Sequence, residues 1–199
     1  MTNPKISTNI GIMIPRLAKN VILSSLKSSG KIILMLGARQ VGKTTLAQDI
    51  ASKLAKKGKR ILYLNCDLAE DLGAVNTNSK LVLERLLSKV DVLLIDEAQR
   101  LDNPGLTLKI IYDNFPNVKV LATGSSSFDL KNKLSDPLTG RYLDFTLYPF
   151  SFTEILPSEG KTKALLKNQA DALLPQVMLY GLYPEVYLSN TPNLKQALL

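Results

Sequence analysis

The chain has 199 residues, 45% hydrophobic and 21% charged, which is an ordinary composition for a globular protein of one or two domains. It has no histidine and a single cysteine, Cys66, which excludes imidazole-based catalysis, intrachain disulfides and multi-cysteine metal sites. No apolar run reaches the ~18 residues that a membrane span needs, and the N-terminus has no clean hydrophobic block, so we expect a cytoplasmic protein without a membrane partner.

The net charge of +8 is unevenly distributed along the chain. Residues 1–60 hold 12 of the 25 Lys and Arg and one acidic residue, Asp49, whereas residues 61–199 have a slight excess of acids. A basic segment of this kind favours an anionic partner. We weigh two interpretations: a solvated helix face such as residues 53–60, or DNA binding through the N-terminal third.

The predicted elements alternate between helices and strands. A helix is expected after Pro15, strands at 31–36, 60–65, 91–95, 118–122 and 142–147, and helices at 44–57, 79–89 and 106–114. This alternation predicts an α/β fold, in which a doubly wound and mostly parallel sheet of five strands is connected by helical crossovers.

The pattern changes after Pro149. We expect helical pieces there, broken at Pro157, Pro175, Gly181 and Pro184. The predicted domains are therefore a core with an N-terminal helix at residues 1–150, and a helical lid or the start of a further domain at 151–199.

Residues 37–45, with the sequence GARQVGKTT, follow a buried strand, open a helix and fit the pattern G-x-x-x-x-G-K-[ST]. Backbone N–H groups of such a loop converge on phosphate oxygens at the start of a helix, where the helix dipole favours an anion. Lys43 is expected to reach the β- and γ-phosphates, and the Thr44 hydroxyl to bind Mg²⁺. The predicted nucleotide-binding residues are Gly37, Ala38, Arg39, Gln40, Val41, Gly42, Lys43, Thr44 and Thr45.

The stretch VLLIDE at residues 92–97 predicts a central strand that ends in two carboxylates. We expect Asp96 to hold Mg²⁺ through its water shell and Glu97 to polarise a water molecule against the γ-phosphate. The expected strand order is 5-1-4-3-2, which places the fourth strand between the strands that end at the phosphate loop and at Asp96. Ser125, at the end of that strand, is the candidate sensor of the γ-phosphate, with Ser126 as the alternative.

Six segments occur in a characteristic order: GARQVGKTTL, DEAQ, TGSSS, LTGR, LYPFSFTE and YGLYPEV. Together they resemble the prokaryotic AAA-type ATPases of the AAA_14 family, over residues 16–186. The resemblance implies an ATP-binding P-loop domain with a helical lid. In that family a second domain of the DUF4143 type usually follows, and we expect this chain to lack most of it.

The resemblance also points to Arg141, in the LTGR segment. A guanidinium at this place would stabilise the γ-phosphoryl group during transfer, delivered from a neighbouring subunit of a homo-oligomer. The alternative is an ion pair between Arg141 and an acid such as Asp144 or Glu154.

From these residues we expect an ATPase that uses ATP and Mg²⁺. Its predicted catalytic residues are Glu97, Lys43, Ser125 and Arg141, and its predicted metal ligands are Thr44 and Asp96. The alternative is a slow nucleotide-dependent switch or scaffold, with or without a DNA partner.

Overall fold

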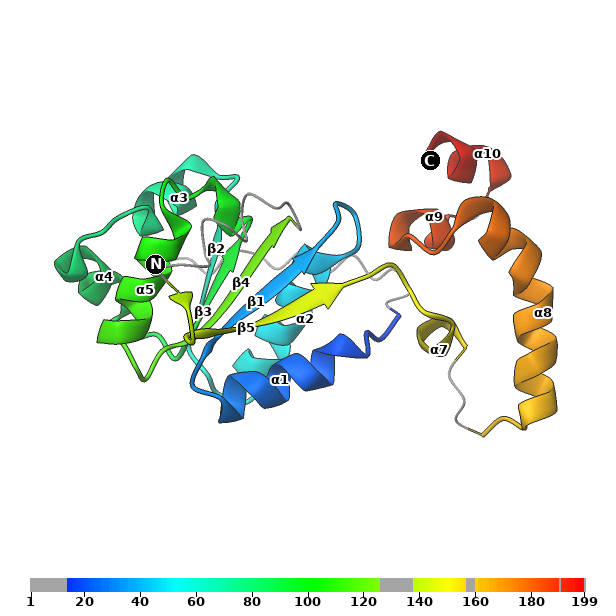
Figure 1. Ribbon diagram of the computed structural model, residues 1–199, viewed down its shortest axis with the longest axis horizontal. Coiled ribbons are helices and arrows are strands. Elements are labelled where there is room, and N and C mark those ends of the chain that lie inside the picture. The colour runs from blue at the N-terminus through cyan, green and yellow to red at the C-terminus, as the bar shows by residue number, and fades with distance from the viewer. Residues whose placement is uncertain (1–13, 126–137, 157–159, 190, 199) are drawn as a thin grey trace. The chain divides into compact units, whose positions relative to one another are not determined.

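The computed structural model describes residues 14–125, 138–156, 160–189 and 191–198 (Figure 1). Its contacts divide the chain into two compact units. The core unit holds residues 18–39 and 43–147, and the second unit holds residues up to 17, residues 40–42 and the chain from 148 onward. None of the described helices has the length and apolar character needed to cross a membrane.

The core unit is built on a five-stranded sheet with the order β2-β3-β4-β1-β5. All neighbouring strands pair in parallel, which confirms the predicted doubly wound sheet. The order is the predicted 5-1-4-3-2 written in the reverse direction. Every residue of β1 and β3 is buried, as their continuous apolar runs predicted. The strands are β1 (Ile32–Gly37), β2 (Ile61–Asn65), β3 (Val92–Asp96), β4 (Lys119–Ser125) and β5 (Tyr142–Leu147).

Helices connect these strands and cover both faces of the sheet, with α1 and α2 on one face and α4 and α5 on the other (Figure 1). Two short elements, α3 and the 3₁₀ turn η1, were not predicted, because neither is long enough to show an apolar period. The helices of the core unit are α1 (Ala18–Ser28), α2 (Lys43–Ala55), α3 (Ala69–Val75), α4 (Lys80–Leu87), η1 (Ala98–Arg100) and α5 (Pro104–Asn114).

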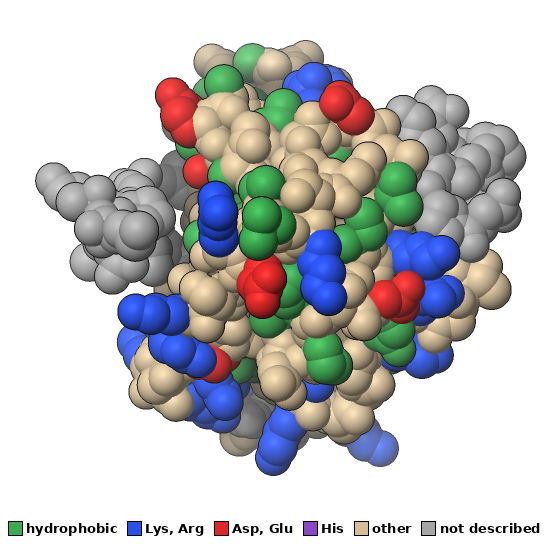
Figure 2. All heavy atoms as spheres, turned by 90° about the vertical axis from the view of Figure 1, so that its left-hand side faces the viewer, with side chains coloured by type: hydrophobic (Ala, Val, Ile, Leu, Met, Phe, Trp, Pro, Cys, Tyr) green, Lys and Arg blue, Asp and Glu red, His purple; other side chains and the backbone are tan. Residues whose placement is uncertain are grey.

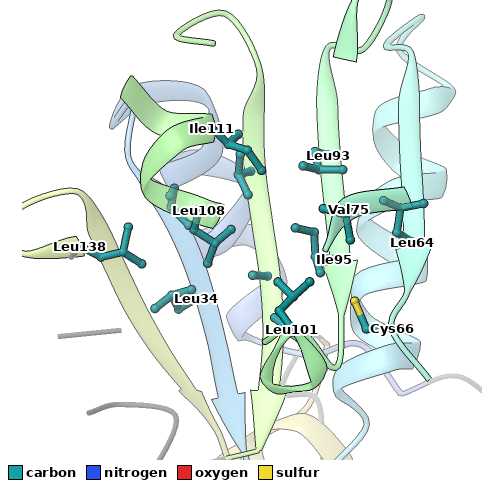
Figure 3. Close-up of a cluster of buried hydrophobic side chains, with 14 of the residues drawn as sticks. Leu34, Leu64, Cys66, Val75, Leu93, Ile95, Leu101, Leu108, Ile111 and Leu138 are labelled. Carbon is teal, nitrogen blue, oxygen red and sulfur yellow. The ribbon is translucent and has the colours of Figure 1, made fainter. Parts of the chain in front are cut away.

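One face of the sheet packs into a continuous hydrophobic core (Figure 3). Leu93 and Ile95 of β3 are fully buried there with Leu108 and Ile111 of α5. Burying each such side chain contributes about 1.5–3 kcal/mol. The core therefore holds the strands in fixed register, so that the loops at the sheet's carboxyl edge project from a rigid base. Cys66 belongs to the same cluster, and burial raises the pKa of its thiol to about 12.

The described part of the second unit is helical: α7 (Phe152–Ile155), α8 (Lys163–Tyr180), α9 (Pro184–Leu188) and α10 (Pro192–Ala197). The predicted break at Pro175 is wrong, because α8 continues through it. Pro175 has no N–H, so the helix gives up one backbone hydrogen bond, and it ends only before Gly181, at φ 72°. Pro184 opens α9 in the first helical turn, where a missing N–H costs nothing.

Candidate functional site

The phosphate loop joins β1 to α2 at the carboxyl edge of the sheet, since Gly37 ends the strand and Lys43 begins the helix. Its backbone enters the left-handed region at Gln40, with φ 62°, and at Gly42, with φ 91°. A Cβ at residue 42 would meet its nearest atoms, in Arg16 and Pro184, at 3.6 and 3.8 Å, which is ordinary contact. The backbone conformation, and not the available space, therefore requires glycine at this position.

Lys43 is 6% exposed and directs its ammonium group into the loop. Nζ donates hydrogen bonds to the carbonyl oxygens of Gly37, at 3.0 Å, and Ala38, at 2.8 Å. Burial lowers the pKa of Lys43, and the nearby carboxylates of Glu97 and Asp96 oppose that lowering. The loop and the two predicted acids therefore act on the same cation.

Asp96, the last residue of β3, is 1% exposed and has a hydrogen-bond partner on each carboxylate oxygen. The Tyr63 hydroxyl of β2 donates to Oδ2 at 2.7 Å, and the Thr123 hydroxyl of β4 donates to Oδ1. Burial and the Asp96 charge both raise the pKa of Tyr63, so its hydroxyl remains a donor. These contacts from the two neighbouring strands hold the carboxylate in one orientation.

Glu97 follows Asp96 with a left-handed backbone conformation, at φ 55°, and precedes η1. Its N–H donates to the Thr123 hydroxyl oxygen at 3.2 Å, so Thr123 contacts both acidic residues. The Gln99 side-chain amide donates to the Glu97 carboxylate. Gln99 Oε1 is buried, and no described residue donates to it.

The residues at this edge suit Mg²⁺ better than a metal ion whose ligands all come from the protein, such as a structural Zn²⁺. The described residues contain no cluster of three or more His, Cys, Asp or Glu side chains able to hold a metal ion. Mg²⁺ takes one or two protein oxygens and completes its shell with water and phosphate. The half-buried Thr44 beside the loop and the oriented Asp96 carboxylate are oxygen donors of the required kind.

Ser125 ends β4 and pairs in register with Gly37, the residue that begins the phosphate loop. The expected position of the fourth strand, between β1 and β3, is confirmed. The alternative sensor, Ser126, lies outside the described residues. Sequence reasoning missed Thr123, two residues earlier, because β4 was expected to end at residue 122 and Thr123 lies inside the strand.

Arg141 lies at the other edge of the sheet from the phosphate loop. It precedes the first residue of β5, and its carbonyl accepts the N–H of Ile32, the first residue of β1. Six strand residues span about 17 Å, so the core unit places Arg141 away from its own phosphate loop. Its guanidinium forms an ion pair with Asp113 at 3.0 Å. The expected ion-pair partners, Asp144 and Glu154, are therefore wrong.

Arg16 is a residue of the second unit whose contacts the sequence did not predict. Its guanidinium donates to the Val41 carbonyl of the phosphate loop at 2.8 Å and to Glu154 at 3.1 Å. It also lies over the Phe150 ring, 5.0 Å from the centroid. Glu154 closes a capping box with Ser151. Burial raises the pKa of its carboxyl, but hydrogen bonds from the Ser151 and Leu17 backbones and the Arg16 charge outweigh it, so the pKa is lowered overall. One side of the loop backbone is thus held by a nearly buried ion pair.

Residues 29–156 match the AAA_14 model, described as an AAA domain. The chain belongs to the AAA_14 family. The chain is 28% identical, over 184 residues, to an uncharacterized protein of Haemophilus influenzae, covering 89% of the chain and 45% of that protein. The chain thus spans less than half the length of this relative.

Solved structures that share the fold of this chain include a Walker-type ATPase and DnaA. A Walker-type ATPase of Pyrococcus abyssi has a TM-score of 0.58 at 18% identity, covering 88% of this chain and 66% of that one. AMPPCP-bound DnaA from Aquifex aeolicus has a TM-score of 0.50 at 20% identity, covering 83% of this chain and 61% of that one. At these identities the likeness establishes the P-loop NTPase fold alone.

Proposed function

We propose that this AAA domain binds Mg-ATP and hydrolyses its γ-phosphate bond. The observation that carries the proposal is the Thr123 hydroxyl, which bonds to both Asp96 and Glu97 beside the buried ammonium of Lys43. The family and the P-loop NTPase fold support nucleotide binding at this edge.

Residues 37–45 would hold the triphosphate. The start of α2 and the turn at residues 40–42 supply backbone N–H groups and a favourable dipole. The Lys43 ammonium would exchange its two loop carbonyls for β- and γ-phosphate oxygens. Burial strengthens this attraction, because the ammonium has little water to lose.

Thr44 and Asp96 would hold the metal ion, which when bound neutralises phosphate charge. Asp96 would serve this purpose without rearrangement, because hydroxyls of two neighbouring strands already orient its carboxylate. The half-buried Tyr63 hydroxyl keeps its proton and cannot compete as a second anion.

Glu97 would accept a proton from the attacking water. Its backbone is fixed by Thr123 and its carboxylate by Gln99, so the base is oriented before substrate arrives. Ser125, level with Gly37, would sense the γ-phosphate. A second copy of the chain would supply Arg141, since each copy places this arginine away from its own loop.

Binding and turnover of ATP by the parent protein and the Lys43→Ala variant test the proposal. Loss of the ammonium should weaken nucleotide affinity by at least about 100-fold, because a buried charge interaction disappears. Lys53→Ala, near the end of the same helix, is the matched control and should bind as the parent does. Parent-like affinity in Lys43→Ala would contradict the assignment of the loop.

The second candidate is a nucleotide-dependent switch that binds ATP and scarcely turns it over. Turnover measured against the fraction of protein with bound nucleotide separates a switch from an ATPase. A DNA partner along the basic N-terminal third is a further proposal, supported by the charge asymmetry of the sequence. The cytoplasmic location stays a prediction.

A further inference from the structure

Lysines from separate parts of the chain gather at the amino edge of the sheet, opposite the phosphate loop. Four adjacent strands each have a lysine at or shortly before their first residue. These are Lys59 before β2, Lys89 before β3, Lys119 at the start of β4 and Lys31 before β1. Neighbouring strands lie about 4.8 Å apart, so the four positions form a row about 15 Å long.

The sequence had placed the basic surface in the first 60 residues, but two of these four lysines come from later in the chain. Backbone hydrogen bonds bring the strand starts together: Lys119 N–H donates to the Asp91 carbonyl, and Asp91 N–H to the Arg60 carbonyl. Lys27, Lys56 and Lys57, at the ends of α1 and α2, add to the row. We call these seven the edge lysines: Lys27, Lys31, Lys56, Lys57, Lys59, Lys89 and Lys119.

Two acids near this row already have arginine partners. Asp91 pairs with Arg60 at 2.8 Å and Asp113 with Arg141 at 3.0 Å. Over the described chain, the ion pairs include none of the edge lysines. Lys and Arg side chains predominate over Asp and Glu in the lower half of the view in Figure 2. The described ion pairs therefore leave the edge lysines without a paired acid.

Helix stability accounts for part of this row only. Lys27, Lys56 and Lys57 lie where a helix C-terminus favours a cation. Lys31, Lys59 and Lys89 likewise follow the ends of α1, α2 and α4 by a few residues, whereas Lys119 is the first residue of β4 and lies beyond the last turn of α5. The large apolar side chains exposed in the core unit (Val21, Leu68, Leu81 and Val82) lie at helix starts or after β2, away from this edge. A lipid surface commonly engages apolar and basic side chains together, whereas a phosphate backbone needs cations alone.

We propose that the edge lysines bind the phosphate backbone of a nucleic acid, on the edge opposite the ATP site. This inference rests on the proposed DNA partner and specifies where it binds. It does not depend on whether the protein hydrolyses ATP. The strands fix the backbone positions of these lysines. A lysine ammonium lacks the planar fork of donors that makes paired hydrogen bonds to one base and distinguishes it from another. Binding is accordingly independent of sequence, with a salt slope of about −3 to −4 for four contacts to a duplex.

The test measures the anisotropy of labelled duplex and single-stranded oligonucleotides between about 50 and 200 mM salt. The edge variant carries Lys31→Gln, Lys59→Gln, Lys89→Gln and Lys119→Gln. The control variant carries Lys80→Gln, Lys109→Gln, Lys163→Gln and Lys167→Gln, which removes the same charge elsewhere. The edge variant should lose at least about tenfold in affinity and most of the salt slope, while the control stays close to the parent. Melting temperatures show that both variants fold.

Equal losses in the two variants would overturn the proposal, since net charge alone would then explain binding. If the parent protein binds neither the duplex nor the single-stranded oligonucleotide, the proposal is also overturned. Binding to phosphatidylserine vesicles without binding to oligonucleotides would assign the edge to a membrane surface instead. The Lys43→Ala variant should bind oligonucleotides as the parent does, so failure of the ATP proposal and failure of this one are distinguishable.

Discussion

The two edges of the sheet carry charges of different kinds. At the carboxyl edge, Asp96 and Lys43 are 1% and 6% exposed, and both are hydrogen-bonded within the protein. At the amino edge, the edge lysines have no described ion-pair partner. A buried charge must have its partners, because removing it from water without them costs several kcal/mol. A solvated lysine has no such requirement. Substitutions at the carboxyl edge should therefore change stability and turnover, whereas substitutions of the edge lysines should change neither.

Asp96→Asn should give the largest change. The amide keeps the shape but removes the charge that would attract the metal ion, and it has one acceptor where two hydroxyls now donate. We expect the apparent Mg²⁺ affinity to fall by more than about 100-fold, measured as the Mg²⁺ dependence of turnover. Asp67→Asn, at an exposed position, is the control. An unchanged Mg²⁺ dependence would remove Asp96 from the metal site.

Thr123→Val sharpens the comparison at a residue that sequence reasoning missed. Valine fills the same space but leaves Asp96 without one donor and the Glu97 N–H without its acceptor. We expect about 1–3 kcal/mol less stability in denaturant unfolding, and about 10- to 100-fold slower turnover. Thr107→Val, at an equally buried position on α5, should leave turnover unchanged. Equal turnover in both variants would reduce Thr123 to a packing residue.

Arg60→Gln should give the smallest change, because its ion pair with Asp91 is exposed to solvent. Hydrogen bonds from Arg60 hold the pKa of Asp91 below its usual range. The pair therefore stabilises the fold above the unfolded-state pKa of about 3.9, and that stability is lost as the pH falls further. The difference in melting temperature between parent and variant should be small at pH 7 and shrink below about pH 4. A difference that grows in acid would contradict this sign.

The sheet and the position of the phosphate loop were predictable because they depend on local patterns. Continuous apolar runs identify strands buried on both faces, and a glycine loop between strand and helix has a recognisable spacing. The order of the strands, and hence the neighbours of Asp96, was expected from the phosphate-loop and VLLIDE motifs together, which are typical of P-loop ATPases of the additional-strand class.

The partners of the acids were not predictable from the same patterns. Tyr63 and Thr123 read as ordinary residues of β-strands, and their contacts with Asp96 depend on strand register and side-chain rotamers. Likewise, the edge lysines come from segments far apart in the sequence. The excess of Lys and Arg in the first 60 residues therefore identified only some of them.

The central claim is that two adjacent carboxylates act differently, Asp96 on the metal and Glu97 on water. Nucleotide binding and single-turnover hydrolysis by Glu97→Gln, beside the exposed control Glu84→Gln, test it most directly. The glutamine oxygen can still accept from Gln99, so ATP affinity should stay within a few-fold of the parent. Turnover should fall by about 10²–10⁴-fold, because an amide cannot take the proton. Hydrolysis by Glu97→Gln at the parent rate would contradict the account.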